Sequence, residues 1–177
     1  SSTNRLHGLD GLRAVSILLV MASHVAGSAL IGGGHIPLGS AHAWGKVGVR
    51  VFFVISGLLI TKLLLDERDK HGGVSIKAFY VRRAFRILPA FFVYIATVSL
   101  LSWLGAATLP LNDVVHALTY TTNFDVERSW LVSHIWSLSV EEQFYLFWPL
   151  AFGLLSRRAA FWVAFVTCVV SPLARLF

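Results

Sequence analysis

Apolar runs long enough to cross a bilayer constrain the fold of this chain more than any other feature. About twenty predominantly apolar residues span the ~30 Å hydrocarbon core as a helix. Lipid offers the backbone no hydrogen-bond partner, so membrane-crossing segments of this kind are helical. The predicted fold is therefore an all-α polytopic transmembrane helical bundle of about four to five spans. The expected spans are residues 12–31, 47–65, 87–104, 135–155 and 159–173.

The composition agrees with a membrane protein and excludes several other classes. Apolar residues make up 56% of the chain and charged residues only 14%, which is unusual for a soluble domain. The net charge of +6 could indicate nucleic-acid binding, but the basic residues cluster between the apolar runs. Cys168 is the only cysteine, so neither an intrachain disulfide nor a cysteine-based metal site is expected.

Several local features predict how the helices begin, end and pack. Asp10 is a candidate N-cap residue for the first span, and Pro89 lies near the start of the third, where a missing amide donor costs little. Gly48 and Gly57 are candidate points of close packing between helices. Residues 111–124 are short and threonine-rich, and a loop, a re-entrant piece and a poor span all stay open for them.

The distribution of basic residues predicts the orientation in the membrane. Lysine and arginine accumulate in cytoplasmic loops, and the segment between the second and third runs is rich in both. This segment should be cytoplasmic, which also places the amino terminus in the cytoplasm. Its basic residues, together with Lys62 at the end of the second run, are Arg68, Lys70, Lys77, Arg82, Arg83 and Arg86.

Two ionisable residues lie within the first run. Arg13 and His24 are eleven residues apart, so they share a helix face at an axial separation of about 16 Å. Ionisable residues inside membrane spans often mark functional sites, and imidazole titrates near neutrality, as a general base requires. The alternatives are an arginine that snorkels to the interface and a histidine that only hydrogen-bonds a neighbouring helix.

Two further charged clusters are candidate site residues. Arg82, Arg83 and Arg86 stand at the cytoplasmic entrance of the third run, where they could clamp phosphates or simply orient the helix against anionic lipid. Glu141 and Glu142 are adjacent in a span, so they should point about 100° apart and not face the same partner. One of them could counter an arginine, orient an imidazole, contact a hydroxyl or form a purely structural ion pair.

Four ordered motifs resemble the membrane acyltransferase-3 family. They are LDGLRAV at 9–15 followed by Ser23-His24, GVRVFFVISGLL at 48–59, FYVRRAFRILP at 79–89 and HIWSLSVEEQFY at 134–145. The resemblance covers nearly the whole chain to about residue 155. The family domain has about ten helical spans and is about twice as long as this chain, so the resemblance implies that residues 1–177 correspond to its amino-terminal half, without a separate soluble domain.

The resemblance implies an acyltransferase of the multi-pass inner (cytoplasmic) membrane. Such enzymes transfer an acyl group, commonly acetyl from acetyl-coenzyme A, to a hydroxyl of an extracytoplasmic carbohydrate such as lipopolysaccharide, exopolysaccharide or peptidoglycan. The expected catalytic residues are His24, Arg13, Glu141 and Glu142, and the expected donor-binding residues are Arg82, Arg83 and Arg86. No metal is expected, and the partners are acyl-coenzyme A, a cell-surface glycan or glycolipid, and membrane lipid.

The sequence leaves two other classes of function open. In a transporter, His24 and Glu141 could relay protons, although the spans lack the paired Gly/Pro interruptions typical of broken transport helices. A non-catalytic membrane subunit would use the same charged residues only for assembly.

Overall fold

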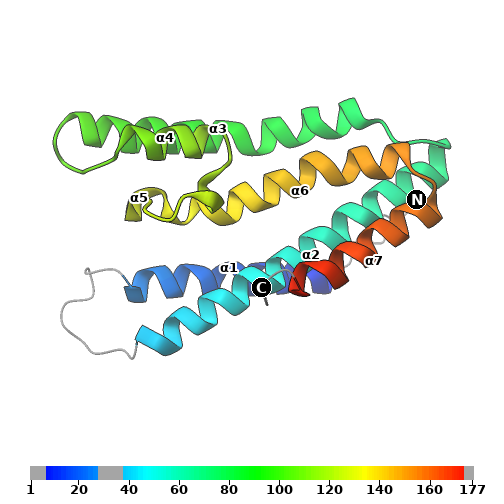
Figure 1. Cartoon of the computed structure of the whole chain (residues 1–177), viewed down its shortest axis with the longest axis horizontal. Helices are drawn as coiled ribbons and strands as arrows, with labels where there is room; N and C mark the ends of the chain where they lie inside the picture. The colour runs from blue at the N-terminus through cyan, green and yellow to red at the C-terminus, as the bar shows by residue number, and fades with distance from the viewer. Residues whose placement is uncertain (1–6, 28–37, 174–177) are drawn as a thin grey trace. The chain divides into compact units, whose positions relative to one another are not determined.

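The computed structural model describes residues 7–27 and 38–173, and this part of the chain is helical, with no β-strand (Figure 1). The prediction of an all-α polytopic bundle is confirmed. The helices are α1 (His7–Gly27), α2 (Leu38–His71), α3 (Ile76–Trp103), α4 (Leu111–Leu118), η1 (Thr122–Phe124), α5 (Trp130–Ser133), α6 (Ile135–Leu154) and α7 (Arg157–Leu173).

Three of the described helices are long and apolar enough to cross a membrane. The candidate segments are Gly8–Ala26, Ala43–His71 and Ile76–Trp103. The chain is therefore a multi-pass membrane protein. The crossings expected from α6 and α7 stay predictions.

Helix boundaries differ from the prediction at two places. The helix α3 begins at Ile76, so the basic segment is part of the helix, and Pro89 lies in its interior and not near its start. The helix α1 begins at His7, which makes Asp10 a residue of the first turn and not the N-cap. Both differences have one cause: polar residues continue each helix beyond its apolar part, where the sequence pattern carries no membrane signal. Asp10 still complements the positive end of the helix dipole.

The described residues form two compact units, one up to Asp66 and one from Glu67 onward, and α2 contributes to both. In the first unit, α1 packs closely against α2 at Gly48. A Cβ atom added to Gly48 would lie 2.7 Å from the backbone oxygen of Ser16 and 3.0 Å from Val20 Cγ2. The predicted close packing at Gly48 is confirmed, whereas that at Gly57 stays a prediction.

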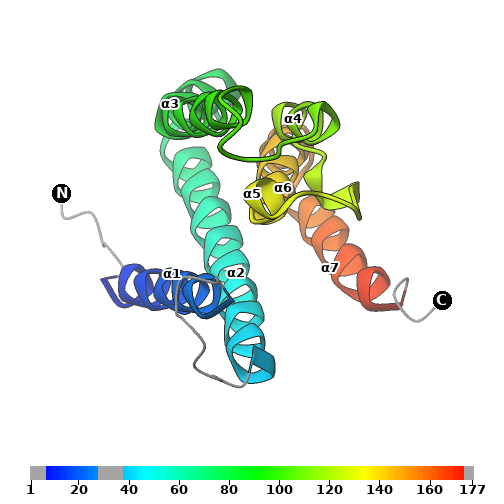
Figure 2. The same ribbon diagram turned by 90° about the vertical axis from the view of Figure 1, so that its left-hand side faces the viewer.

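The second unit has a core between α3, α4, α5 and α6. Residues 111–124 form no span: they fold into α4 and η1, which pack on α3 and α6 respectively (Figures 1 and 2). Because Ala117 of α4 packs in one core with Phe91 and Ile95, this segment returns to the middle of α3. The core residues are Phe91, Ile95, Ala117, Val132 and Ile135.

Candidate functional site

An ion pair joins α3 to α6 inside the second unit. Arg83 Nη2 lies 2.5 Å from Glu142 Oε1, and Arg83 Nε lies 3.3 Å from Glu142 Oε2. Two parallel contacts of this kind fix the orientation of the guanidinium as well as its position. The two side chains are 14% and 20% exposed, so the pair is largely removed from the surface of the unit.

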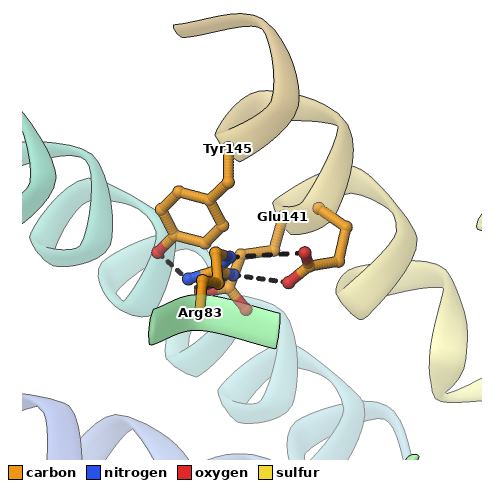
Figure 3. A network of polar contacts seen from close by, with 4 residues as sticks. Arg83, Glu141 and Tyr145 are labelled. Carbon is orange, nitrogen blue, oxygen red and sulfur yellow. Dashed lines mark hydrogen bonds and ion pairs between the residues drawn. The ribbon is translucent and has the colours of Figure 1, made fainter. Parts of the chain in front are cut away.

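Glu141 also faces this guanidinium. Its Oε1 atom lies 3.9 Å from Arg83 Nη2 and accepts a hydrogen bond of 2.7 Å from the Tyr145 hydroxyl (Figure 3). The guanidinium carbon of Arg83 lies 3.1 Å from the centre of the Tyr145 ring, in cation–π geometry. Tyr145, one turn after Glu141, therefore holds both partners.

The prediction that the two glutamates could not share a partner was wrong. Adjacent Cα–Cβ bonds do diverge by about 100°, but the guanidinium presents donors along two edges, and the glutamate side chains have enough rotatable bonds to converge on it. Glu142 contacts both Nε and Nη2 of Arg83, and Glu141 Oε1 lies 3.9 Å from the same Nη2 atom. The network thus holds two carboxylates beside a single guanidinium.

The next residue of α6, Gln143, anchors the turn after α4. Its Nε2 atom donates to the backbone oxygen of Tyr120 at 2.8 Å and to Asn123 Oδ1 at 3.0 Å. Three consecutive polar residues, 141–143, thereby bind two different elements. Neither the role of Gln143 nor those of Tyr120, Asn123 and Tyr145 was predicted from the sequence, although Gln143 and Tyr145 lie in the motif that carries the glutamates.

Tyr120 has an unusual backbone. It follows α4 with a φ angle of 52°, in the left-handed region. Its N–H donates to Ala117 O, and the N–H of Thr121 donates to His116 O, which together make a Schellman motif with tyrosine at the position that glycine usually fills. Burial and the charge of Glu142 raise the pKa of the Tyr120 phenol, and Arg83 acts in the opposite direction.

The three predicted donor-binding arginines do not face the same way. The Arg82 side chain is 61% exposed and lies 4.0 Å from Glu67, and Arg86 is exposed as well. Arg83 instead turns toward α6. Arg82 and Arg86 are therefore accessible to an anion on the second unit, whereas the Arg83 guanidinium is engaged by carboxylates.

Arg13 and His24 both lie on α1, within the candidate span Gly8–Ala26. The guanidinium carbon of Arg13 lies 5.2 Å from the centre of the Phe52 ring of α2, and His24 occupies the last turn of α1 with an exposed side chain. Arg13 and His24 belong to the first unit, whereas the Arg83 network belongs to the second. Within residues 7–27 and 38–173, no group of three His, Cys, Asp or Glu side chains is placed to hold a metal ion.

The fold and the site define a class: a multi-pass α-helical membrane protein with an arginine–carboxylate network between two helices. The acyltransferase-3 family, described as an acyltransferase domain, matches residues 6–174. The chain belongs to this family.

Several relatives carry O-acetyltransferase names. A Staphylococcus aureus (strain COL) protein provisionally named as an O-acetyltransferase is 36% identical over 93% of this chain. The peptidoglycan O-acetyltransferase OatA of Listeria monocytogenes (strain EGD-e) is 32% identical over 80% of the chain, and the O-acetyltransferase OatA of S. aureus (strain NCTC 8325) is 32% identical over 89%. The matches cover only 28%, 23% and 26% of those proteins. No solved structure matches the chain.

Proposed function

We propose that this chain is part of an integral-membrane O-acetyltransferase that moves an acetyl group from acetyl-coenzyme A to a hydroxyl of an extracytoplasmic carbohydrate. Family membership and the names of the relatives support the reaction type. One relative is named for peptidoglycan, which makes peptidoglycan the first acceptor to test. Lipopolysaccharide and exopolysaccharide are the next acceptors in the same chemical class.

One observation carries the proposal: two of the four family motifs meet in the structure. Arg83 belongs to the motif at 79–89, and Glu141, Glu142 and Tyr145 belong to the motif at 134–145, and all four make one network. A charged network inside a membrane bundle is costly unless its members pair, so such networks often mark functional sites.

For the donor, we propose that Arg82 and Arg86 hold the phosphates of coenzyme A. Both arginines of α3 are exposed and lie one turn apart, so both guanidinium groups are available to the same ligand, and each can bind phosphate oxygens in bidentate geometry. Arg83 was predicted to bind the donor, and we now propose a different role for it. Its guanidinium contacts Glu142 at 2.5 Å, so it positions the carboxylates, and it could bind the donor only if this ion pair broke.

For the chemistry, we propose His24 as the general base. Neutral imidazole takes the proton of the acceptor hydroxyl while that oxygen attacks the thioester carbon. The carbon–sulfur bond then breaks, and the departing thiolate takes up the proton as coenzyme A leaves. Glu141 and Glu142 would orient or charge-balance the reacting groups.

The orientation follows from the basic segment around α3, which we place on the cytoplasmic side of the inner membrane together with the amino terminus. The donor would then enter from the cytoplasm. The acceptor would approach from the opposite face.

The test compares cell-envelope glycans from cells with and without the intact gene. Mass spectrometry should detect an acetyl increment only when the gene is intact. His24→Ala should lower the ester-linked acetyl content at least about 100-fold, the range expected for losing a general base. His71→Ala, at the exposed end of α2, is the matched control and should leave acetylation intact. Near-normal acetylation in His24→Ala cells would refute the role of His24, and an unchanged glycan without the gene would refute the function.

A further inference from the structure

The turn after α4 keeps a tyrosine where the backbone favours glycine. Tyr120 adopts a φ of 52° at the closing position of a Schellman motif. A bulky residue is disfavoured in this left-handed conformation, and glycine is not. Residues held in such conformations cluster at functional sites. The backbone does not explain why a tyrosine occupies this position, so the explanation must lie in its side chain.

Packing explains the ring of Tyr120 but not its hydroxyl. The ring stacks on Phe91, with centroids 5.1 Å apart and planes 28° apart. A phenylalanine would stack equally well. The Tyr120 Oη atom is buried and has no hydrogen-bond partner among the residues that the structure describes, an arrangement that destabilises a folded protein.

The surroundings of Tyr120 are those of a polar site. Its backbone oxygen accepts a hydrogen bond from Gln143, the residue directly after Glu142, and the charges of Glu142 and Arg83 both act on its phenol. Two other hydroxyls of the same region, those of Thr122 and Ser139, are buried and likewise lack a hydrogen-bond partner within the described residues. Ser139 lies one turn before Gln143 on α6.

We propose that Tyr120 is a substrate-contacting residue: its hydroxyl donates a hydrogen bond to an oxygen of the hydroxyl-bearing acceptor that is bound beside the Arg83–Glu142 pair. A carbohydrate hydroxyl suits this place because it accepts from the phenol and donates to a carboxylate at the same time. This inference rests on the proposed acetyltransferase function and assigns an acceptor contact to the second unit.

The test uses the intact protein in membranes, with labelled acetyl-coenzyme A as the donor probe and the glycan of the same envelope as acceptor. Tyr120→Phe removes one oxygen and keeps the ring. We expect acetyl incorporation to fall about tenfold, the effect of one lost hydrogen bond of ordinary strength in the reacting complex. The unfolding temperature should stay equal or rise, because the variant buries no unpaired hydroxyl.

Tyr94→Phe is the matched control, since the Tyr94 hydroxyl is already used in a 2.6 Å hydrogen bond to the backbone oxygen of Leu131. It should lower the unfolding temperature and keep the acetyl incorporation per folded protein. Incorporation by Tyr120→Phe at the parent level would overturn the proposal and leave the function intact. So would a loss of activity that merely follows a lower unfolding temperature. If the parent protein transfers no acetyl group, the proposed function fails, and the role of Tyr120 fails with it.

Discussion

Replacing Arg83 by methionine tests whether the network between α3 and α6 stabilises the second unit. Methionine keeps most of the volume and removes the charge. Glu142 then loses two contacts, at 2.5 and 3.3 Å, and Glu141 loses the cation at 3.9 Å. Two carboxylates stay close together without a counter-charge, which strongly destabilises a protein interior.

The expected loss follows from the burial of the pair. Removing one partner of a buried ion pair costs about 3–5 kcal/mol, and exposed pairs are worth about 0–1 kcal/mol. With side chains 14% and 20% exposed, the Arg83–Glu142 pair lies near the lower end of the buried range, so Arg83→Met should cost about 3 kcal/mol. The neighbouring change Arg82→Met should cost under about 0.5 kcal/mol, because that side chain is 61% exposed and lies 4.0 Å from Glu67.

A double-mutant cycle measures this pair directly. The free energy of unfolding of the purified intact protein in mild-detergent micelles is followed by titration with a denaturing detergent for Arg83→Met, Glu142→Gln and the double variant. We expect the double variant to lose less than the sum of the single losses, with a coupling energy of about 1–2 kcal/mol. A coupling near zero, or equal losses for Arg83→Met and Arg82→Met, would refute the pairing of Arg83 with Glu142.

Three further predictions concern other parts of the chain. Gly48→Ala should destabilise by about 1–3 kcal/mol, because its Cβ would meet the Ser16 backbone oxygen at 2.7 Å; detergent-titration stability equal to the parent would contradict that contact. Asp113→Ala should destabilise the protein by about 1–3 kcal/mol, because the Ser129 N–H donates to the buried Asp113 carboxylate at 2.8 Å and would lose this partner. An unchanged rate of proteolysis in residues 125–130 would contradict this prediction. The pKa of Tyr120 is raised on folding, so its phenol contributes stability that is complete below its ordinary pKa and is lost as the pH rises above about 10. Tyr120→Phe should therefore reduce the slope of the unfolding free energy against pH above about 10. An identical slope in the variant and the parent would contradict the raised pKa.

The all-α class could be predicted from apolar run length, but the short helices α4 and α5 and the polar extensions of the long helices could not. Ile76–Arg86 is as helical as the apolar part of α3, yet a hydropathy pattern detects only apolar residues. For the same reason, Pro89 was predicted near the start of the helix but lies in its interior. The turn at Tyr120 was missed for a different reason: a Schellman motif is recognised by its glycine, and here a tyrosine occupies that position.

The candidate site residues could be named from the sequence, but not their pairing. Arg83 and Glu142 are 59 positions apart, and no local pattern tells which of three arginines meets which of two glutamates. Charge and spacing identify candidates because ionisable residues are rare in spans. Their contacts depend on how α3 and α6 pack, which is a property of the tertiary structure.

The rotation of a helix by 100° per residue accounts for the different environments of the basic motif of α3. Arg82 and Arg86 are 40° apart around the axis, whereas Arg83 is 100° from the first and 60° from the second. One short motif can therefore present two guanidinium groups to an anion and turn a third toward Glu142. Because Arg83 lies on the same helix, any rotation of α3 that brings Arg82 and Arg86 toward bound phosphates also moves the Arg83–Glu142 pair. Donor binding and the carboxylate network would then be mechanically coupled through α3. Loss of that pair should accordingly change the affinity for coenzyme A, even though neither Arg83 nor Glu142 belongs to the proposed phosphate-binding residues.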